Sequence, residues 1–171
     1  MTRLFAVLAL FGICLPIFAD ESANPSERSL AGCYLKGVQA SDYSTRGLVV
    51  KTHSYLEIKK DDAGALVFET VVIGANLNIC GADGKLEEVS HARDKTVLRL
   101  IPTPEMPAEH AASDQRSCRL QIVATSRAFY LEDPEGACRE FFFCGAGVGL
   151  DGEHFDRRRS KQTKGKRCPP Y

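Results

Sequence analysis

Residues 54–73 read SYLEIKKDDAGALVFETVVI, and this segment carries two β-strand patterns on either side of a turn. In its first part, apolar Leu56 and Ile58 alternate with charged or polar neighbours, so they fall on one face of an extended chain. Residues 61–64, DDAG, tolerate a tight turn, and the β-branched and aromatic side chains of residues 66–73 favour a second strand. The segment therefore predicts an antiparallel β-hairpin.

Short β-rich segments separated by turn residues recur along the rest of the chain. Further strands are expected at residues 30–34, 85–92, 96–101, 118–122, 129–131 and 138–144. The Asp-Gly pair in residues 82–84 predicts a second turn, Pro and Gly in residues 133–136 predict a third, and residues 102–117, with three prolines, predict a surface loop. About eight short strands indicate an all-β, antiparallel meander. Closure of this sheet into a small barrel would remove its exposed edges.

The start of the chain has the features of a secretory signal peptide. Arg3 precedes an apolar run at residues 4–18, and Ala19 is a small residue suited to cleavage. The length of 171 residues, with 44% hydrophobic and 26% charged residues, favours one folded domain over disorder or a coiled coil. We divide the chain into a signal peptide at residues 1–19, a polar lead-in at residues 20–29, a single barrel domain at residues 30–155 and a basic tail at residues 156–171. The expected location is the periplasm or the cell exterior.

Lipoprotein processing at Cys33 is an alternative for the same region. Residues 30–33 read LAGC, which resembles a bacterial lipoprotein cleavage box. Such a box should directly follow the apolar core of a signal, whereas charged residues such as Asp20 and Arg28 intervene here. We therefore favour cleavage after Ala19, with residues 30–34 as the first strand.

Six cysteines follow the signal segment, an even number that favours three disulfides in an exported protein. They are Cys33, Cys80, Cys118, Cys138, Cys144 and Cys168. If residues 138–144 form one continuous strand, its two cysteines lie about 20 Å apart and bond to other partners. Cys33 and Cys168 are candidates to pin the two ends of the domain, although nothing in the sequence pairs them. No Cys-x-x-Cys motif and no metal-binding spacing of the four histidines occurs, so no metal is expected.

No catalytic or cofactor-binding motif occurs, and adjacent acidic pairs are expected to face water. We therefore expect no enzyme activity and no cofactor. Partner contacts are expected instead at three turns or loops. Their candidate residues are Asp61, Asp62, Gly64, Asp133, Glu135, Gly145, Gly147, Gly149 and Asp151. The glycine-rich residues 145–152 have two interpretations, a loop that approaches a ligand closely or a bulge where the last strand bends.

Charge is distributed unevenly although the whole chain is formally neutral. Residues 20–155 carry a net charge of −7, and the tail carries +6. The basic residues of the tail are Arg157, Arg158, Arg159, Lys161, Lys164, Lys166 and Arg167. Such a tail can contact anionic envelope surfaces or an acidic partner, or it can fold back on the acidic body. Nucleic acid is not an expected partner, because aromatic residues for base stacking are not interleaved with the basic ones.

The segment Gly32-Cys33-Tyr34, the short alternating strands and the size of the mature chain resemble calycin-type secreted barrels. This group includes lipocalins and the periplasmic lysozyme inhibitors of bacteria. Lipocalins usually carry Trp where this chain has Tyr34, and no functional residue transfers from the resemblance. It implies either a binding or inhibitory role or the transport of a small ligand.

These observations together predict an exported, non-catalytic binding or inhibitory module of the bacterial periplasm. Its acidic body suits a basic protein partner, for example a lysozyme. The alternative is a lipocalin-like carrier of a small apolar ligand. That alternative requires a hollow barrel lined by residues such as Leu56, Phe68 and Phe142.

Overall fold

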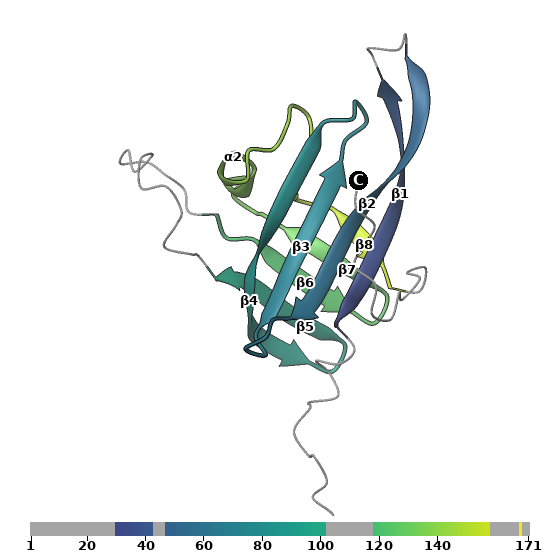
Figure 1. Ribbon diagram of the computed structural model, residues 1–171. Helices are drawn as coiled ribbons and strands as arrows, with labels where there is room; N and C mark the ends of the chain where they lie inside the picture. The colour runs from purple at the N-terminus through teal and green to yellow at the C-terminus, as the bar shows by residue number, and fades with distance from the viewer. Residues whose placement is uncertain (1–29, 43–46, 102–117, 158–167, 169–171) are drawn as a thin grey trace, which may run out of the picture.

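The computed structural model describes residues 30–42, 47–101, 118–157 and 168. Eight strands and one short helix lie within these residues (Figure 1). They are β1 (Gly32–Asp42), β2 (Leu48–Lys60), β3 (Leu66–Ile73), β4 (Ile79–Ala92), β5 (Lys95–Ile101), β6 (Gln121–Thr125), β7 (Ala128–Glu132), α2 (Cys138–Phe141) and β8 (His154–Asp156). Each strand pairs antiparallel with the next in sequence order. The predicted all-β meander is confirmed.

Side chains and a disulfide, rather than a backbone ladder, bring the first and last parts of the sheet together. Among the described residues, backbone hydrogen bonds join each strand to the next one from β1 to β8. They do not join β8 back to β1. Lys36 on β1 donates a hydrogen bond of 2.5 Å to the Glu153 carboxylate, just before β8. A disulfide joins Cys33 on β1 to Cys168. The sheet therefore forms a nearly closed barrel.

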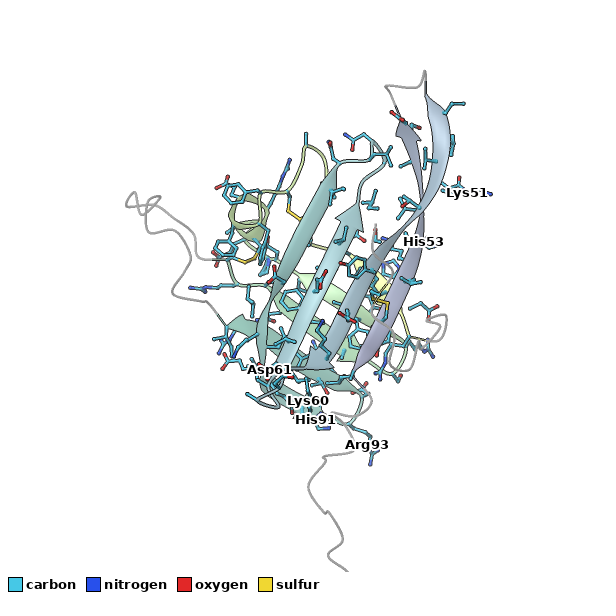
Figure 2. The ribbon with its side chains drawn as sticks, viewed as in Figure 1. Lys51, His53, Lys60, Asp61, His91 and Arg93 are labelled. Carbon is cyan, nitrogen blue, oxygen red and sulfur yellow. A yellow bond between two sulfur atoms is a disulfide. The ribbon has the colours of Figure 1, made fainter. Side chains whose placement is uncertain are left out.

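The β1–β2 hairpin extends beyond the rest of the barrel (Figure 1). The two strands pair as far as Asp42 and Leu48, whereas β3 pairs with β2 only along residues 55–60. Lys51 and His53 lie on the extended part (Figure 2). The sequence patterns predicted only the inner half of this hairpin, because the outer half has little burial to impose alternation.

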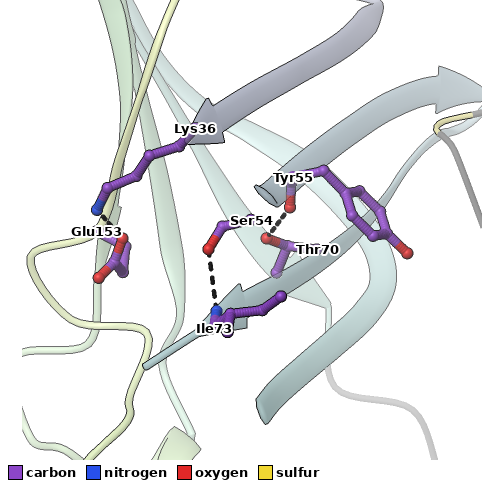
Figure 3. A network of polar contacts seen from close by, with 6 residues as sticks. All are labelled: Lys36, Ser54, Tyr55, Thr70, Ile73 and Glu153. Atoms are coloured by element: carbon purple, nitrogen blue, oxygen red, sulfur yellow. Dashed lines mark hydrogen bonds and ion pairs between the residues drawn. The ribbon is translucent and has the colours of Figure 1, made fainter. Parts of the chain in front are cut away.

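The barrel interior is filled by apolar side chains, as the alternation in β2 and β3 predicted. Leu56, Ile58, Phe68, Leu98, Leu120, Ile122, Phe129, Leu131 and Phe155 are each at most 2% exposed. Two polar side chains in this interior are satisfied by hydrogen bonds (Figure 3). Ser54 Oγ accepts from the Ile73 backbone N–H at 2.9 Å, and Thr70 Oγ1 donates to the Tyr55 carbonyl at 2.6 Å. The interior is therefore packed, without unpaired hydroxyl groups at these two positions.

The turn expected at residues 82–84 is wrong. Asp83 and Gly84 lie inside β4, opposite Glu69 and Phe68 of β3. The actual β3–β4 turn occupies residues 74–78, where the Gly74 N–H donates to the Asn78 carbonyl at 2.9 Å. Gly84 is required for close packing instead, because a Cβ at this position would lie 2.5 Å from Leu100 Cδ1.

The strand expected at residues 138–144 is also wrong, because this segment begins with the helix α2. The turn at residues 133–136 is confirmed, since the Gly136 N–H donates to the Asp133 carbonyl at 2.9 Å. The Asp133 side chain then accepts from the Cys138 N–H at 3.0 Å, and this bond holds the chain in a helical turn. The expected strand at residues 118–122 becomes regular only at Gln121, where β6 begins.

All six cysteines form disulfides, which confirms the predicted framework. The pairs are Cys33–Cys168, Cys80–Cys144 and Cys118–Cys138, with Cα–Cα distances of 5.6, 4.2 and 4.4 Å. Cys138 and Cys144 bond to other partners, as expected, although the strand from which we argued this does not exist. The pin between Cys33 and Cys168 is confirmed. These disulfides indicate an oxidising, extracytoplasmic environment.

The segments 1–29, 102–117, 158–167 and 169–171 lie outside the described residues. The expectations for the signal peptide, the lead-in, the surface loop and most of the basic tail lie there with them. Within the described segments, the helix is too short to cross a membrane.

Candidate functional site

A groove of about 620 Å³ lies along β3 and β4, with Lys59 of β2 at one end. It is open because Gly81 places no side chain on the sheet at this point. Outward-facing carboxylates from three neighbouring strands lie on or beside it: Glu57 is directly opposite Glu69, and Glu69 is directly opposite Asp83. We call Glu57, Glu69 and Asp83 the acidic row. Like charges at directly opposed positions destabilise a sheet. The acidic row therefore lowers the stability of the folded protein.

Among the described residues, nearby cations compensate the acidic row only in part. Glu57 accepts from Lys59 at 2.8 Å, and Glu69 accepts a hydrogen bond from the Tyr55 hydroxyl. The next lysine, Lys85, is directed to Asp61 on the β2–β3 turn at 3.4 Å. Among the described residues, the row therefore has more carboxylates than paired cations, and Glu57, with its side chain 12% exposed, is the most covered of the three.

The end of the basic tail is attached beside the acidic row. Cys33 lies directly opposite Glu57, and it is bonded to Cys168. This disulfide packs with Tyr55, which is only 6% exposed although it lies on the outer face of the sheet. The disulfide therefore places Cys168, a residue of the tail, beside the row.

The three candidate partner loops do not form one surface. The β2–β3 turn with Asp61, Asp62 and Gly64 lies at one end of the barrel, whereas residues 133–136 and 145–152 lie at the other. Asp61 is used within its own turn, because its carboxylate accepts from the Ala63 and Ala65 N–H groups at 3.0 and 2.9 Å. The bond from Ala65 is the main reason why the pKa of Asp61 is lowered.

The loops at the other end are tied to each other through Asp133 and Asp151. The Asp133 N–H donates to Asp151 Oδ1 at 2.8 Å, and the Asp133 side chain is buried. Burial raises the pKa of the Asp133 carboxyl, and the nearby charges of Asp151 and Glu135 add to this rise. Glu135 lies 3.6 Å from Arg119 in a weak ion pair. These acidic residues organise the loops, which is a different role from direct partner contact.

The glycine-rich segment closes against the β3–β4 turn. The Gly145 N–H donates to the Ile79 carbonyl at 3.0 Å, and a Cβ at Gly145 would lie 2.8 Å from Asn78. Gly147 and Gly149 have open space around their Cα atoms. The segment is therefore a loop packed onto the end of the barrel, and the bulge in a last strand that we considered is absent.

The three residues that were expected to line a ligand cavity do not lie together in one cavity. Leu56 and Phe68 are packed inside the barrel, whereas Phe142 is partly buried beside α2. The described residues contain no group of three or more His, Cys, Asp or Glu side chains arranged to hold a metal ion.

Sequence reasoning missed the acidic row because it depends on strand register. Glu57 and Glu69 were visible on the polar face of the predicted hairpin, but a turn closed at residues 61–64 would have placed Glu57 opposite Phe68, one residue out of the observed register. Asp83 was assigned to a turn, so its place in the same row was lost.

The fold and site define a class of protein: a small antiparallel β-barrel, stapled by three disulfides, with an acidic outer surface. Comparison with protein-family models, with curated proteins and with solved structures gave no match.

Proposed function

We propose that this protein is an exported, non-catalytic binding module that recognises a basic protein partner. The observation that carries this proposal is the acidic row, in which three carboxylates from β2, β3 and β4 lie side by side on a rigid outer surface. Charge complementarity of this kind steers a basic partner and fixes its orientation. A cost in sheet stability is consistent with a surface kept for binding.

The packed interior favours this module over a carrier. The side chains of Leu56, Phe68 and Phe129 occupy the space that an apolar ligand would need in a lipocalin-like barrel. The three disulfides add rigidity, so little ordering of the row is needed when a partner binds.

The proposed location is the bacterial periplasm, after removal of a signal peptide by cleavage following Ala19. The disulfides support an oxidising compartment, and the apolar run at residues 4–18 supports export. The resemblance to calycin-type barrels supports a lysozyme as the kind of basic partner, with inhibition as the proposed consequence of binding.

The test compares a row variant with a matched control. Glu69→Gln with Asp83→Asn removes two charges from the row, and Glu132→Gln with Glu140→Gln removes two exposed charges elsewhere. Each oxidised protein is used as bait for periplasmic extract and for purified basic lysozyme, at low and at moderate salt.

We expect a salt-sensitive protein partner to be retained by the wild type and the control and lost by the row variant. Equal retention by the row variant, or the absence of any retained protein, would overturn the proposal. Co-purification of a small apolar molecule in place of a protein would favour the carrier.

A further inference from the structure

A second cleft, of about 290 Å³, lies at the end of the barrel where β4 turns into β5 and β6 turns into β7. Its walls are residues 91–96, residues 124–126, Leu30 and Arg157. Lys95 of β5 is paired with Thr125 of β6, so the two turns lie next to each other. Figure 2 shows His91 and Arg93 at this end of the molecule. The cleft is separate from the acidic row, which lies on the outer face of β2–β4.

Three of the residues that line this cleft carry cationic side chains, and a histidine lies beside them. Arg93 lies in the β4–β5 turn, Lys95 begins β5, Arg157 follows β8, and His91 lies near the end of β4. Asp94 is the one acidic residue among the residues that line it. Two segments that are far apart in the sequence, residues 93–95 and Arg157, thus bring positive charge to one small concave surface of an otherwise acidic barrel.

Arg157 is held in place before any ligand arrives. Its backbone N–H donates to the Arg127 carbonyl at 2.9 Å, and its Nη1 donates to the Thr125 carbonyl at 2.6 Å. Its guanidinium lies 5.1 Å from the centre of the Phe129 ring, within the range of a cation–π contact. A guanidinium held in this way loses little conformational freedom when it binds an anion.

The remaining groups suit closure around an anion. His91 is oriented by a 2.8 Å contact between its Nδ1 and Thr96 Oγ1. Arg93 and Lys95 are exposed and carry long side chains that can turn towards an oxyanion in the cleft. Arginine and lysine together are the usual ligands of phosphate in proteins.

We propose that this cleft binds a phosphate group, supplied by a phospholipid headgroup or by free phosphate. Arg157 is the first basic residue of the tail, and Arg158 and Arg159 follow it directly in the sequence. An anionic phospholipid surface would supply a phosphate group to the cleft and negative charge to the basic residues of the tail. The acidic row would then remain available to a protein partner.

The test is a titration of the oxidised, exported protein with inorganic phosphate, at constant ionic strength against chloride, followed by backbone amide NMR. Arg93→Gln with Lys95→Gln removes two cations from the cleft. Lys51→Gln with Arg139→Gln is the matched control, because it removes one lysine and one arginine near the opposite end of the barrel.

We expect saturable shifts in residues 91–96 and 125–127 for the wild type and the control, and affinity roughly tenfold weaker in the cleft variant. Unsaturable shifts, or equal affinity in the cleft variant, would overturn the proposal. A second arm uses vesicles of anionic or of zwitterionic phospholipid. Binding to anionic vesicles that weakens in the cleft variant identifies the lipid headgroup as the source, and phosphate binding without vesicle binding identifies free phosphate.

Discussion

The carboxyl group of Asp133 lies in surroundings that oppose its ionisation. The residue is only 3% exposed, and its Oδ1 has no hydrogen-bond partner among the described residues. Its other oxygen accepts from the Cys138 N–H, which helps α2 to begin. Asp133 therefore contributes a useful hydrogen bond and carries a desolvation cost at the same position.

The desolvation cost of the Asp133 carboxylate should make the stability of the protein depend on pH. Because burial raises the pKa of Asp133 above its ordinary value of 3.8, the folded state holds the proton more tightly than the unfolded state. Protonated Asp133 therefore contributes favourably to the free energy of unfolding below pH 3.8. This contribution is lost as pH rises through the higher pKa of the folded state. We expect Asp133→Asn to gain stability relative to the wild type between acidic and neutral pH, as measured by urea unfolding at several pH values.

Asp133→Ala provides the comparison, because it also removes the acceptor for the Cys138 N–H. We expect this variant to lose about 1 kcal/mol of unfolding free energy relative to Asp133→Asn. If the unfolding free energies of the wild type and Asp133→Asn differ by the same amount at every pH, the ionisation of Asp133 does not cost stability as proposed.

Strand β4 shows how a local signal can be overridden by packing. Asp-Gly is a common turn sequence, yet here Asp83 faces outward in the acidic row and Gly84 allows Leu100 to pack closely. Residues 74–78 make the turn in its place. The sequence pattern could not distinguish these two sites, because the reason for Gly84 lies on a strand that follows later in the chain.

Two glycines of β4 give a matched test of this interpretation. A Cβ at Gly84 would lie 2.5 Å from Leu100 Cδ1, and the φ angle of Gly84 is +156°, whereas the nearest atom to a Cβ at Gly81 is 4.0 Å away. We expect Gly84→Ala to destabilise the protein by about 1–3 kcal/mol, because Leu100 is buried and has little room to move. We expect Gly81→Ala to change stability far less. Urea midpoints of the two variants measure the difference, and equal midpoints would show that close packing does not explain Gly84.

At the scale of the whole molecule, closure of the barrel depends on contacts between distant parts of the chain. Lys36 and Glu153 are separated by 117 residues, and Cys33 and Cys168 by 135. The short β8 adds only three residues to the sheet. The disulfide therefore supplies a large part of the link between the first strand and the chain that follows the last.

Disulfide removal should reflect the size of the loops that are closed. Cys33–Cys168 spans 135 residues and Cys118–Cys138 spans 20. Chain entropy predicts a loss of about 5 kcal/mol for the first and about 3 kcal/mol for the second when both cysteines are replaced by serine. Thermal or urea unfolding of the two double variants gives the order. A smaller loss for Cys33→Ser with Cys168→Ser would show that loop entropy does not dominate the effect of this disulfide.

The amino-acid sequence by itself determined the class of fold, the disulfide chemistry and several strands. Alternation of Leu56 and Ile58 with polar neighbours is a local property with a period of two residues, so it survives without knowledge of the partner strand. The number of cysteines likewise predicted their oxidised state but not their pairing.

Only the tertiary structure decided the pairs of cysteines, the acidic row and the cationic cleft. Each of them joins residues from different strands, and their positions depend on strand register and on barrel closure, which no local pattern encodes. The sequence showed an acidic body and a basic tail. The folded chain placed the acidic row beside the Cys33–Cys168 disulfide and placed Arg157 in a cleft with Arg93 and Lys95.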